Sequence, residues 1–279
     1  MMEPGFYKIS NEKYHSGAGV SRSFLWRLET ETPLDALIPV KETDDMKFGN
    51  DFHCAVLEPV RFDKEYITVP EDCLIGSGKG QRIRLAEFME KVETQGLSIL
   101  KPADLEKIKR MREAVFSHPL ASELLSNGQS EISGFWYDPV ETDILCKLRM
   151  DFIIEFEHII VDLKKTADAN PEHPFFKNTA YRLGYDMEAH WYLYGATQIT
   201  RIEHKEFKFI ASEDHEPWKV QVYPADEELK YHGNLRCSRA FNKYVECFRS
   251  GEWPGLPPEE VPLSLPGWVR RQEGYGSGI

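Results

Sequence analysis

The sequence predicts a single α/β domain, and three observations support this prediction. Apolar side chains in residues 84–127 recur at the three- and four-residue spacing that is typical of helices. Residues 131–166 instead alternate apolar and polar side chains, as strands with one buried face do. The 279 residues contain no stretch that looks like a long linker, and 41% of them are hydrophobic, enough for a large core. We therefore expect one domain over residues 1–270 and a disordered tail over residues 271–279.

The first part of the chain is expected to form helices. A serine cap and the apolar spacing predict a short amphipathic helix within residues 21–33. Gly49 and Asn50 are expected to break the chain, and a second helix is expected to follow them and to end at Pro59. This second helix carries His53. A lone histidine on a helix is more often a partly buried core residue than a catalytic one, so the helix alone assigns His53 no function.

The second part of the chain is expected to alternate strands with helices. An aromatic-rich strand opens at Glu131, a hairpin covers residues 146–166, and a proline-punctuated loop follows it. Helices are expected from Phe175 onward and over residues 225–249, with two strands between them. One stripe of the first helix carries Tyr181, Tyr185, Glu188, Tyr192 and Gly195. Such an aromatic stripe ordinarily packs in a core.

The stretch of residues 146–166 predicts two strands joined by a short turn. In the second strand Asp162 and Lys164 share one face, because successive side chains of a strand point to opposite faces. The first strand sets its charged side chains against its apolar ones: Lys147, Arg149 and Asp151 on one face, Cys146, Leu148, Met150 and Phe152 on the other. The hairpin can therefore gather two carboxylates and a cation at one place.

Charge determines what such a place can do. Two carboxylates held a few ångströms apart repel each other, so one of them takes up a proton or both share a cation. Ligation by oxygen alone suits Mg²⁺ or Mn²⁺ better than zinc. A protonated lysine beside them can orient an attacking water or stabilise negative charge at a phosphorus centre. The same pattern also fits a solvated amphipathic hairpin with cross-strand ion pairs, because Asp-x-Lys is a short and frequent pattern.

The net charge of −12 argues against a protein that binds nucleic acid over a broad basic face. The cations gather in local groups: Lys79, Arg82 and Arg84; Lys101, Lys107, Lys109, Arg110 and Arg112; and Lys147 with Arg149. The segment from 101 to 113 fits a solvated helix face as well as it fits a DNA contact, because acids are interspersed in it. If these groups do contact DNA, the acidic balance favours DNA held in a confined channel.

The cysteines and the hydropathy exclude several classes of protein. The cysteines are Cys54, Cys73, Cys146, Cys237 and Cys247. Their odd number and the lack of a C-x-x-C pair argue against a disulfide framework, a zinc site and an iron–sulfur cluster. No early stretch resembles a signal peptide, and no run of about 18 apolar residues could span a membrane. We expect reduced thiols in a cytoplasmic protein with no membrane partner.

The motifs of this chain occur in an order that resembles the RecE-like exonucleases of the exonuclease VIII type, within the PD-(D/E)XK nuclease superfamily. They cover roughly residues 8–257 and read FGNDFHCAVLEP, ISGFWYD, CKLRMDFI, VDLKKTADA, YDMEAHWYLYG, FKFIASEDHEPWKVQVY and SGEWPG. Each motif is weak alone, whereas their shared order is specific. The resemblance implies a central mixed β-sheet flanked by helices. It also implies digestion of one strand of double-stranded DNA from an end, 5′→3′, with Mg²⁺ or Mn²⁺, to leave a 3′ overhang.

The resemblance further implies roles for individual residues. It makes Asp151 and Asp162 metal-binding carboxylates, with the backbone carbonyl of Leu163 as a further ligand. Lys164 becomes the catalytic lysine that positions or activates the attacking water. His53, by the same resemblance, is a catalytic histidine beside the metal and a candidate ligand. A looser match makes Glu131 a further acid near the metal.

The helix after the lysine departs from the family pattern. The family carries Q-x-x-x-Y, and this chain has Glu188 in place of the glutamine and retains Tyr192. Both residues are candidate DNA contacts, as are Lys147 and Arg149. An ionised glutamate donates no hydrogen bond and repels phosphate unless it binds metal, is protonated or pairs with a cation such as Lys147 or Arg149. We expect an active nuclease that tolerates this substitution, with an altered DNA grip or metal requirement.

The resemblance also implies partners. These are the ends of double-stranded DNA, a RecT-like single-strand annealing protein and further copies of the chain, with a ring-shaped tetramer as one form of the homo-oligomer. Three alternatives stay open: a restriction-like endonuclease, a non-catalytic protein that binds DNA ends, and an acidic α/β domain with an amphipathic hairpin. Cleavage of closed circular DNA identifies the first, and binding that ignores Mg²⁺ identifies the second.

Overall fold

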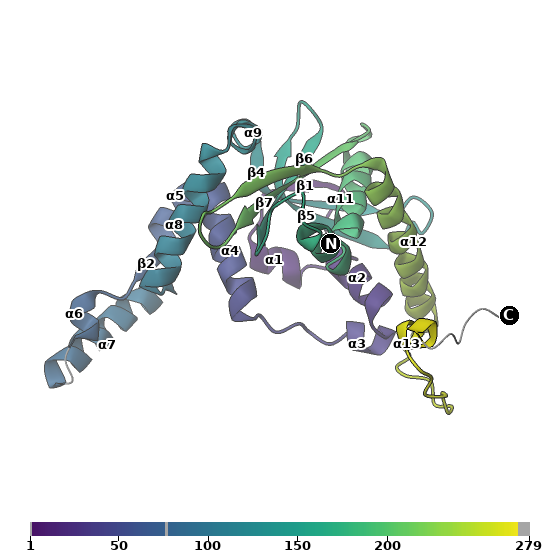
Figure 1. Cartoon of the computed structure of the whole chain (residues 1–279), viewed down its shortest axis with the longest axis horizontal. Helices are drawn as coiled ribbons and strands as arrows, with labels where there is room; N and C mark the ends of the chain where they lie inside the picture. The colour runs from purple at the N-terminus through teal and green to yellow at the C-terminus, as the bar shows by residue number, and fades with distance from the viewer. Residues whose placement is uncertain (1, 76–77, 273–279) are drawn as a thin grey trace.

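The computed structural model describes residues 2–75 and 78–272, and its centre is a six-stranded sheet with the order β1-β4-β5-β6-β7-β8 (Figure 1). The strands are β1 (Gly5–Tyr7), β4 (Gln129–Tyr137), β5 (Leu145–Ile154), β6 (Ile159–Thr166), β7 (Glu206–Glu213) and β8 (Val220–Pro224). Neighbouring strands run antiparallel except β6 and β7, which are parallel. The predicted central mixed sheet is therefore confirmed.

Helices cover both faces of this sheet (Figure 1). On one face pack α2 (Arg22–Thr30), α10 (Phe175–Arg182), α11 (Tyr185–Thr200) and α12 (Glu227–Ser250). On the other face pack α4 (Asp44–Leu57), α5 (Pro59–Glu65), α8 (Pro102–Ser117) and α9 (Pro119–Leu124). The short helices α1 (Asn11–Ser16) and α3 (Pro33–Ala36) flank α2 in the chain. The sheet therefore has a separate hydrophobic core on each face.

The hairpin predicted for residues 146–166 is confirmed as β5 and β6, which pair antiparallel across a turn at residues 155–158. Phe152 pairs with Val161. The pairing ends there: Asp151 directly precedes Phe152 and Asp162 directly follows Val161, and the Asp151 carboxylate accepts a hydrogen bond from the backbone N–H of Leu163 on β6.

Strand β5 changes the face that it buries at Asp151. Met150 packs in the core beneath α11, whereas Phe152 packs in the core beneath α4. The pairing of β4 with β5 passes over Glu131 and Asp151, and Glu131 has a φ of 58°. A backbone in this region is uncommon for a residue other than glycine. The prediction that Phe152 shares a face with Met150 is therefore wrong, because the alternation of β5 is interrupted at Asp151, where its pairing with β4 is interrupted as well.

A small arm extends from the body at α5 (Figure 1). It holds α6 (Glu71–Leu74) and α7 (Lys79–Gln95) between two short parallel strands, β2 (Tyr66–Thr68) and β3 (Ser98–Leu100). Phe88 and Val92 form its own small core with Cys73. Residues 84–127 are mostly helical, as predicted, but they form more than one helix. Gly96, with its left-handed backbone, ends α7, and β3 follows before α8 begins.

Helix α4 differs from the prediction at its start. Gly49 and Asn50 lie inside the helix and do not break it. The helix begins earlier because the Thr43 side chain accepts a hydrogen bond from the backbone N–H of Met46, and two aspartates occupy the first turn. The helix ends at Leu57, close to its predicted end. His53 consequently lies in the last turns of a longer and better capped helix.

The helix predicted from Phe175 onward is two helices. Gly184 has a φ of 72° and separates α10 from α11. A Cβ atom at this position would overlap the ring of Trp26 on α2, so only glycine fits. Tyr181 therefore lies on α10 and is exposed, outside the predicted stripe, whereas Tyr185, Glu188 and Tyr192 share α11.

The remaining expectations concern the C-terminal part and the composition. The predicted long helix is confirmed as α12, and α13 (Gly267–Gln272) follows it, whereas the boundary between the domain and a disordered tail stays a prediction. Residues 273–279 lie outside the described part. All five cysteines are buried and free. Among the described residues, no helix has the length and hydropathy that a membrane crossing requires.

Candidate active site

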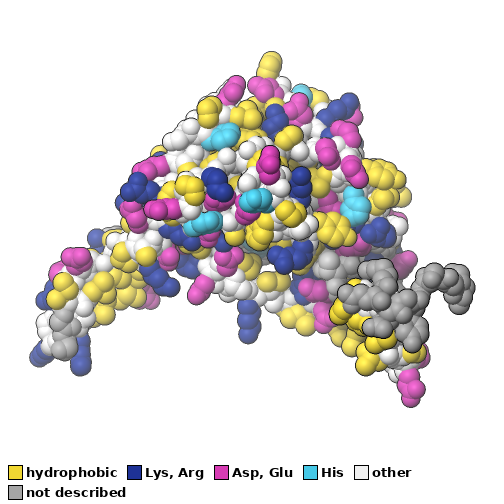
Figure 2. Space-filling view, viewed as in Figure 1, with side chains coloured by type: hydrophobic (Ala, Val, Ile, Leu, Met, Phe, Trp, Pro, Cys, Tyr) yellow, Lys and Arg dark blue, Asp and Glu magenta, His cyan; other side chains and the backbone are white. Residues whose placement is uncertain are grey.

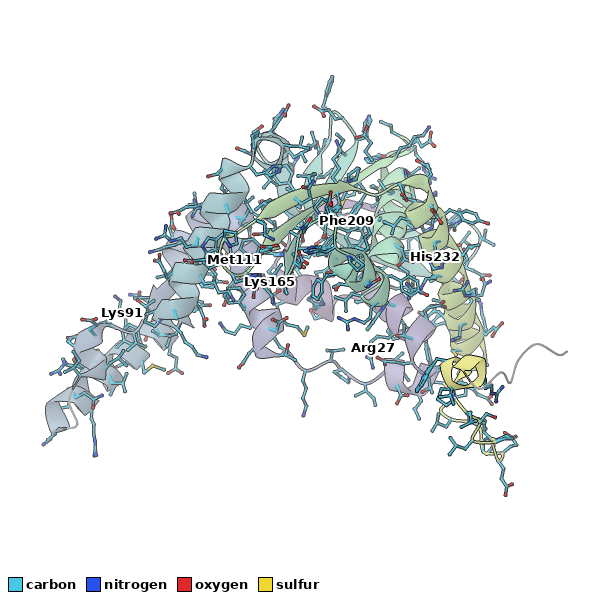
Figure 3. All side chains as sticks on the ribbon, viewed as in Figure 1. Arg27, Lys91, Met111, Lys165, Phe209 and His232 are labelled. Atoms are coloured by element: carbon cyan, nitrogen blue, oxygen red, sulfur yellow. The ribbon has the colours of Figure 1, made fainter. Side chains whose placement is uncertain are left out.

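A cavity of about 370 Å³ lies at the β5–β6 hairpin, between helices of the two layers. The predicted site residues that line it are His53, Glu131, Arg149, Asp151, Asp162, Lys164, Glu188 and Tyr192. Strand β6 carries Lys164. In Figure 3 this strand can be found from the labelled residue Lys165, which directly follows Lys164 and lies between the labels of Met111 and His232. The fold thus brings most of the predicted set together from β4, β5, β6, α4 and α11.

Asp162 and Lys164 come from the same face of β6. The Lys164 ammonium lies 2.6 Å from Asp162 Oδ2 and 3.0 Å from Glu188 Oε2. Burial would lower the pKa of Lys164, but Asp162 and Glu188 raise it above its usual value, so the ammonium stays protonated. Burial raises the pKa of Asp162, and the nearby charges of Glu188 and Asp151 add to the rise. A bound cation would relieve this cost.

Asp151 faces the other layer of helices. Its Oδ2 accepts a hydrogen bond of 2.9 Å from the backbone N–H of Leu163 and lies 3.3 Å from Nδ1 of His53. Burial would lower the pKa of His53, but the carboxylate of Asp151 raises it to about 9. The same contact holds the pKa of Asp151 below its usual range against the effect of burial. His53 is therefore a site residue by position, with a side chain 24% exposed.

Glu131 completes a group of three candidate ligands. Ligand atoms of His53, Glu131 and Asp151 all lie within 4.8 Å of one another. Glu131 owes its place to its left-handed backbone and to Arg149, whose Nη2 lies 2.8 Å from its carboxylate. Burial and the charge of Asp151 raise the pKa of Glu131. Backbone strain of this kind concentrates at functional sites.

Glu188 has other partners than the sequence suggested. Its Oε1 accepts a hydrogen bond of 2.8 Å from Arg22 on α2, and its Oε2 contacts Lys164. Of the three ways in which this glutamate could avoid repelling phosphate, the structure shows pairing with a cation, and the cations are Arg22 and Lys164 in place of Lys147 or Arg149, because Arg149 is engaged by Glu131. Although burial would raise the pKa of Glu188, Arg22 and Lys164 lower it, so this carboxylate is ionised.

Lys147 does not belong to the cavity. It is buried, and its ammonium donates hydrogen bonds to the backbone carbonyls of Tyr14, at 2.9 Å, and Gly17, at 2.5 Å. These bonds fasten α1 to β5 and leave no free cation for DNA. The structure therefore removes Lys147 from the predicted DNA contacts.

Two other predicted residues occupy supporting places. Tyr192 lines the cavity beside Glu188, and burial raises its pKa well above its usual value, so its phenol stays neutral. Leu163 packs its side chain in the core beneath α4, and the role predicted for its carbonyl stays a prediction.

Arg22 is a cavity residue that the sequence reasoning missed. It lies in the first turn of α2, directly after the capping residue Ser21, whose side chain accepts from the N–H of Phe24. A cation there opposes the helix dipole. Its acidic partner, Glu188, is 166 residues away in the chain, so no local pattern in the sequence identifies the pair.

The donor set fits a divalent metal. Asp162 Oδ2 is buried and accepts no hydrogen bond from any described residue, although the Lys164 ammonium lies 2.6 Å away. The other donors are the carboxylates of Asp151 and Glu131 and the imidazole of His53. Carboxylate oxygens are the ligands that Mg²⁺ and Mn²⁺ prefer. These residues are therefore candidate ligands for a divalent cation.

One solved structure shares this architecture. The structure is similar to that of a protein from Eubacterium rectale that is named provisionally as an exonuclease, with a TM-score of 0.60 and 14% identity over 98% of this chain and 100% of that chain. A phage-related exonuclease from Haemophilus somnus 129PT shares 14% identity over 87% of this chain and 100% of that chain, with a TM-score of 0.34. No curated protein matches the sequence.

The family comparison is the more informative one. Residues 29–259 match a family model described as a PDDEXK-like domain of unknown function (DUF3799). The match confirms the predicted PD-(D/E)XK superfamily, while the RecE-like type stays a prediction. Because it covers most of the chain, the protein belongs to this family of PDDEXK-like domains.

Proposed function

We propose that the protein is a Mg²⁺-dependent exonuclease that degrades one strand of linear double-stranded DNA, 5′→3′, and leaves 3′ single-stranded overhangs for recombination. The observation that carries the proposal is the convergence of Asp151, Asp162 and Lys164 in one cavity of a PDDEXK-like domain. The ordered resemblance to RecE-like exonucleases and the name of the Eubacterium rectale protein support the choice of an exonuclease.

The chemistry is assigned to named residues. Asp151, Asp162 and the Leu163 carbonyl would hold the metal, and His53 and Glu131, which have ligand atoms within 4.8 Å of one of Asp151, would be further ligands. Such an ion supplies a Lewis acid for the scissile phosphate and lowers the pKa of water. The Lys164 ammonium orients the attacking water and stabilises the negative charge that develops on the phosphoryl oxygens. Tyr192 lies beside the site as a hydroxyl donor to a DNA phosphate.

The partners belong to the same proposal. A RecT-like annealing protein would receive the overhang, and a ring of several copies would enclose the duplex so that digestion is processive. Light scattering that finds only monomer, with and without DNA, would count against the ring. If an annealing protein is pulled down equally well when the DNA end is blocked against digestion, transfer of the overhang to that protein would not be supported.

The test is digestion of linear duplex labelled at one 5′ or one 3′ end. With Mg²⁺, the account predicts early loss of the 5′ label, retention of the 3′-labelled strand, and no cut in closed circular plasmid. Cutting of the plasmid would identify the alternative, a restriction-like endonuclease. Binding of duplex ends without cleavage in Mg²⁺ or Mn²⁺ would identify a non-catalytic end-binding protein.

A further inference from the structure

Arg22, Glu188 and Lys164 form a chain of charges along one wall of the cavity. Glu188 lies in the middle, with Arg22 at 2.8 Å from one carboxylate oxygen and Lys164 at 3.0 Å from the other. The side chains of Arg22, Glu188 and Lys164 are 17%, 5% and 14% exposed. Removing one partner of such a pair leaves a charge that little water can stabilise.

The position of Arg22 is unfavourable for its own helix. It lies in the first turn of α2, where the helix dipole repels a cation. Its second contact is a weak hydrogen bond of 3.4 Å to the carbonyl of Leu183, next to the break between α10 and α11. Glu188 is therefore the group that stabilises Arg22, and the two side chains tie α2 to α11 beside the cavity.

Lys164 has two anionic neighbours and one aromatic neighbour. Its ammonium lies 2.6 Å from Asp162, 3.0 Å from Glu188 and 4.7 Å from the ring centre of Tyr185. Asp162 is also a proposed metal ligand, and a carboxylate that is shared with a cation holds an ammonium less strongly. Of the two carboxylates that contact Lys164 in the described part of the chain, Glu188 is then the one that is not a proposed metal ligand.

We propose that Glu188 is a positioning residue that holds the Lys164 ammonium toward the reacting phosphate, and that Arg22 neutralises Glu188 so that it does not repel DNA. This inference rests on the proposed function and deepens it. It also replaces the expectation that glutamate is merely tolerated at position 188. A glutamine there would leave Arg22 without a counter-ion and Lys164 with Asp162 alone.

The first experiment needs no cleavage. Urea unfolding is measured for the parent protein, Glu188→Gln, Lys164→Met and the double variant, once in EDTA and once in saturating Mg²⁺. The inference predicts that the effects of the two substitutions are coupled by at least about fivefold in the unfolding equilibrium constant, the ratio that corresponds to about 1 kcal/mol, in both conditions. Additive effects in Mg²⁺ would overturn it, because Glu188 would then not hold Lys164 when metal is bound.

The second experiment separates kcat from KM on linear duplex. Glu188→Gln should lower kcat at least about tenfold, because Lys164 loses the carboxylate that holds its ammonium in position. It should not raise KM, because the cavity then carries one negative charge less beside the DNA phosphate. Arg22→Gln should raise KM severalfold, because Glu188 is then uncompensated beside phosphate. For the double variant Arg22→Gln/Glu188→Gln, kcat/KM relative to the parent should be at least about fivefold higher than the product of the two ratios measured for the single variants. Full activity of Glu188→Gln, or additive effects, would overturn the proposal.

Two further variants keep the outcome clear. Glu188→Asp keeps the negative charge beside Arg22 but shortens the side chain by one methylene and so loosens the contact with Lys164, which should lower kcat and spare KM even if Glu188→Gln fails to fold. The matched control is the exposed pair Arg249 and Glu141, at 2.9 Å and outside the cavity, whose neutral variants should show no coupling. A parent protein without nuclease activity that still shows the unfolding coupling would refute the proposed function and leave the Glu188–Lys164 contact established.

Discussion

Glu131 has a left-handed backbone within β4, with a φ of 58°. Glycine adopts this conformation without strain, whereas an alanine costs about 1 kcal/mol or more. We predict that Glu131→Gly is more stable to urea than Glu131→Ala by about 1 kcal/mol, although both lose most metal-dependent cleavage. The same pair of substitutions at Ser130, which has no positive φ, should rank in the opposite order, because glycine weakens an ordinary strand position. Equal stability of the two variants at Glu131 would show that no strain is stored there.

Asp162 and Lys164 should have separable effects, because one is proposed to hold metal and the other to act on the water. Asp162→Asn should abolish cleavage and weaken Mn²⁺ binding measured by calorimetry. Lys164→Met should lower kcat by about 10²- to 10³-fold, the loss seen on removing one stabilising donor, while Mn²⁺ binding is retained. Loss of Mn²⁺ binding in Lys164→Met together with intact binding in Asp162→Asn would reverse the two assignments.

At the level of single residues, the sequence predicted the site only in part. Alternation within the hairpin was enough to set Asp162 beside Lys164 on one face of β6, because both lie on one strand. His53 and Glu131 were reached only through the family resemblance, since a lone histidine on a helix and a strand-opening acid carry no local signal. Arg22 was missed because its partner Glu188 comes from a helix that only the tertiary fold brings near.

At the level of elements, the break between α10 and α11 places Glu188 at the cavity. We predict that Gly184→Ala destabilises the protein by about 2 to 4 kcal/mol, from the left-handed backbone together with overlap on Trp26. Gly96→Ala is the matched control: its φ is 62°, but an added Cβ meets nothing within 4 Å, so only about 1 kcal/mol should be lost. Denaturant unfolding measures both, and equal losses would show that the Trp26 contact adds nothing.

The same glycine explains why the elements were only partly predictable. The strands of the hairpin were predicted because each carries its own alternation of side chains. The helix break at Gly184 was missed because its cause is the ring of Trp26, from a distant part of the chain. Helix α4 was misread for a different reason: the cap at Thr43 outweighs the cost of Gly49 within the helix, which is about 1 kcal/mol.

At the level of the whole molecule, charge is distributed as the acidic composition suggests. Figure 2 shows lysines and arginines interspersed with aspartates and glutamates over the visible face, without a continuous basic surface. The predicted basic group at residues 79–84 lies on the arm, where Arg84 is held by the Asp72 carbonyl and Lys79 and Arg82 are exposed. In Figure 3 the labelled residue Lys91 marks this arm, which extends away from the sheet.

These two cations should contribute to DNA affinity and not to chemistry. Replacing Lys79 and Arg82 together by glutamine should weaken duplex binding and reduce the slope of log affinity against log salt by about 1 per phosphate contact, or about 2 in total. The kcat at saturating DNA should not change. A control with Lys177 and Lys205 replaced should leave the slope unaltered. An unchanged slope in the arm variant would show that the arm does not contact the duplex.

The central claim is that this cavity is the metal-dependent centre of a DNA exonuclease, and one measurement tests it most directly. Linear duplex labelled at one end is incubated with the parent protein and with Asp162→Asn, each in Mg²⁺ and in EDTA. The account predicts progressive loss of the 5′-ended strand only for the parent in Mg²⁺. Digestion that persists in Asp162→Asn, or that is the same in EDTA as in Mg²⁺, would contradict it.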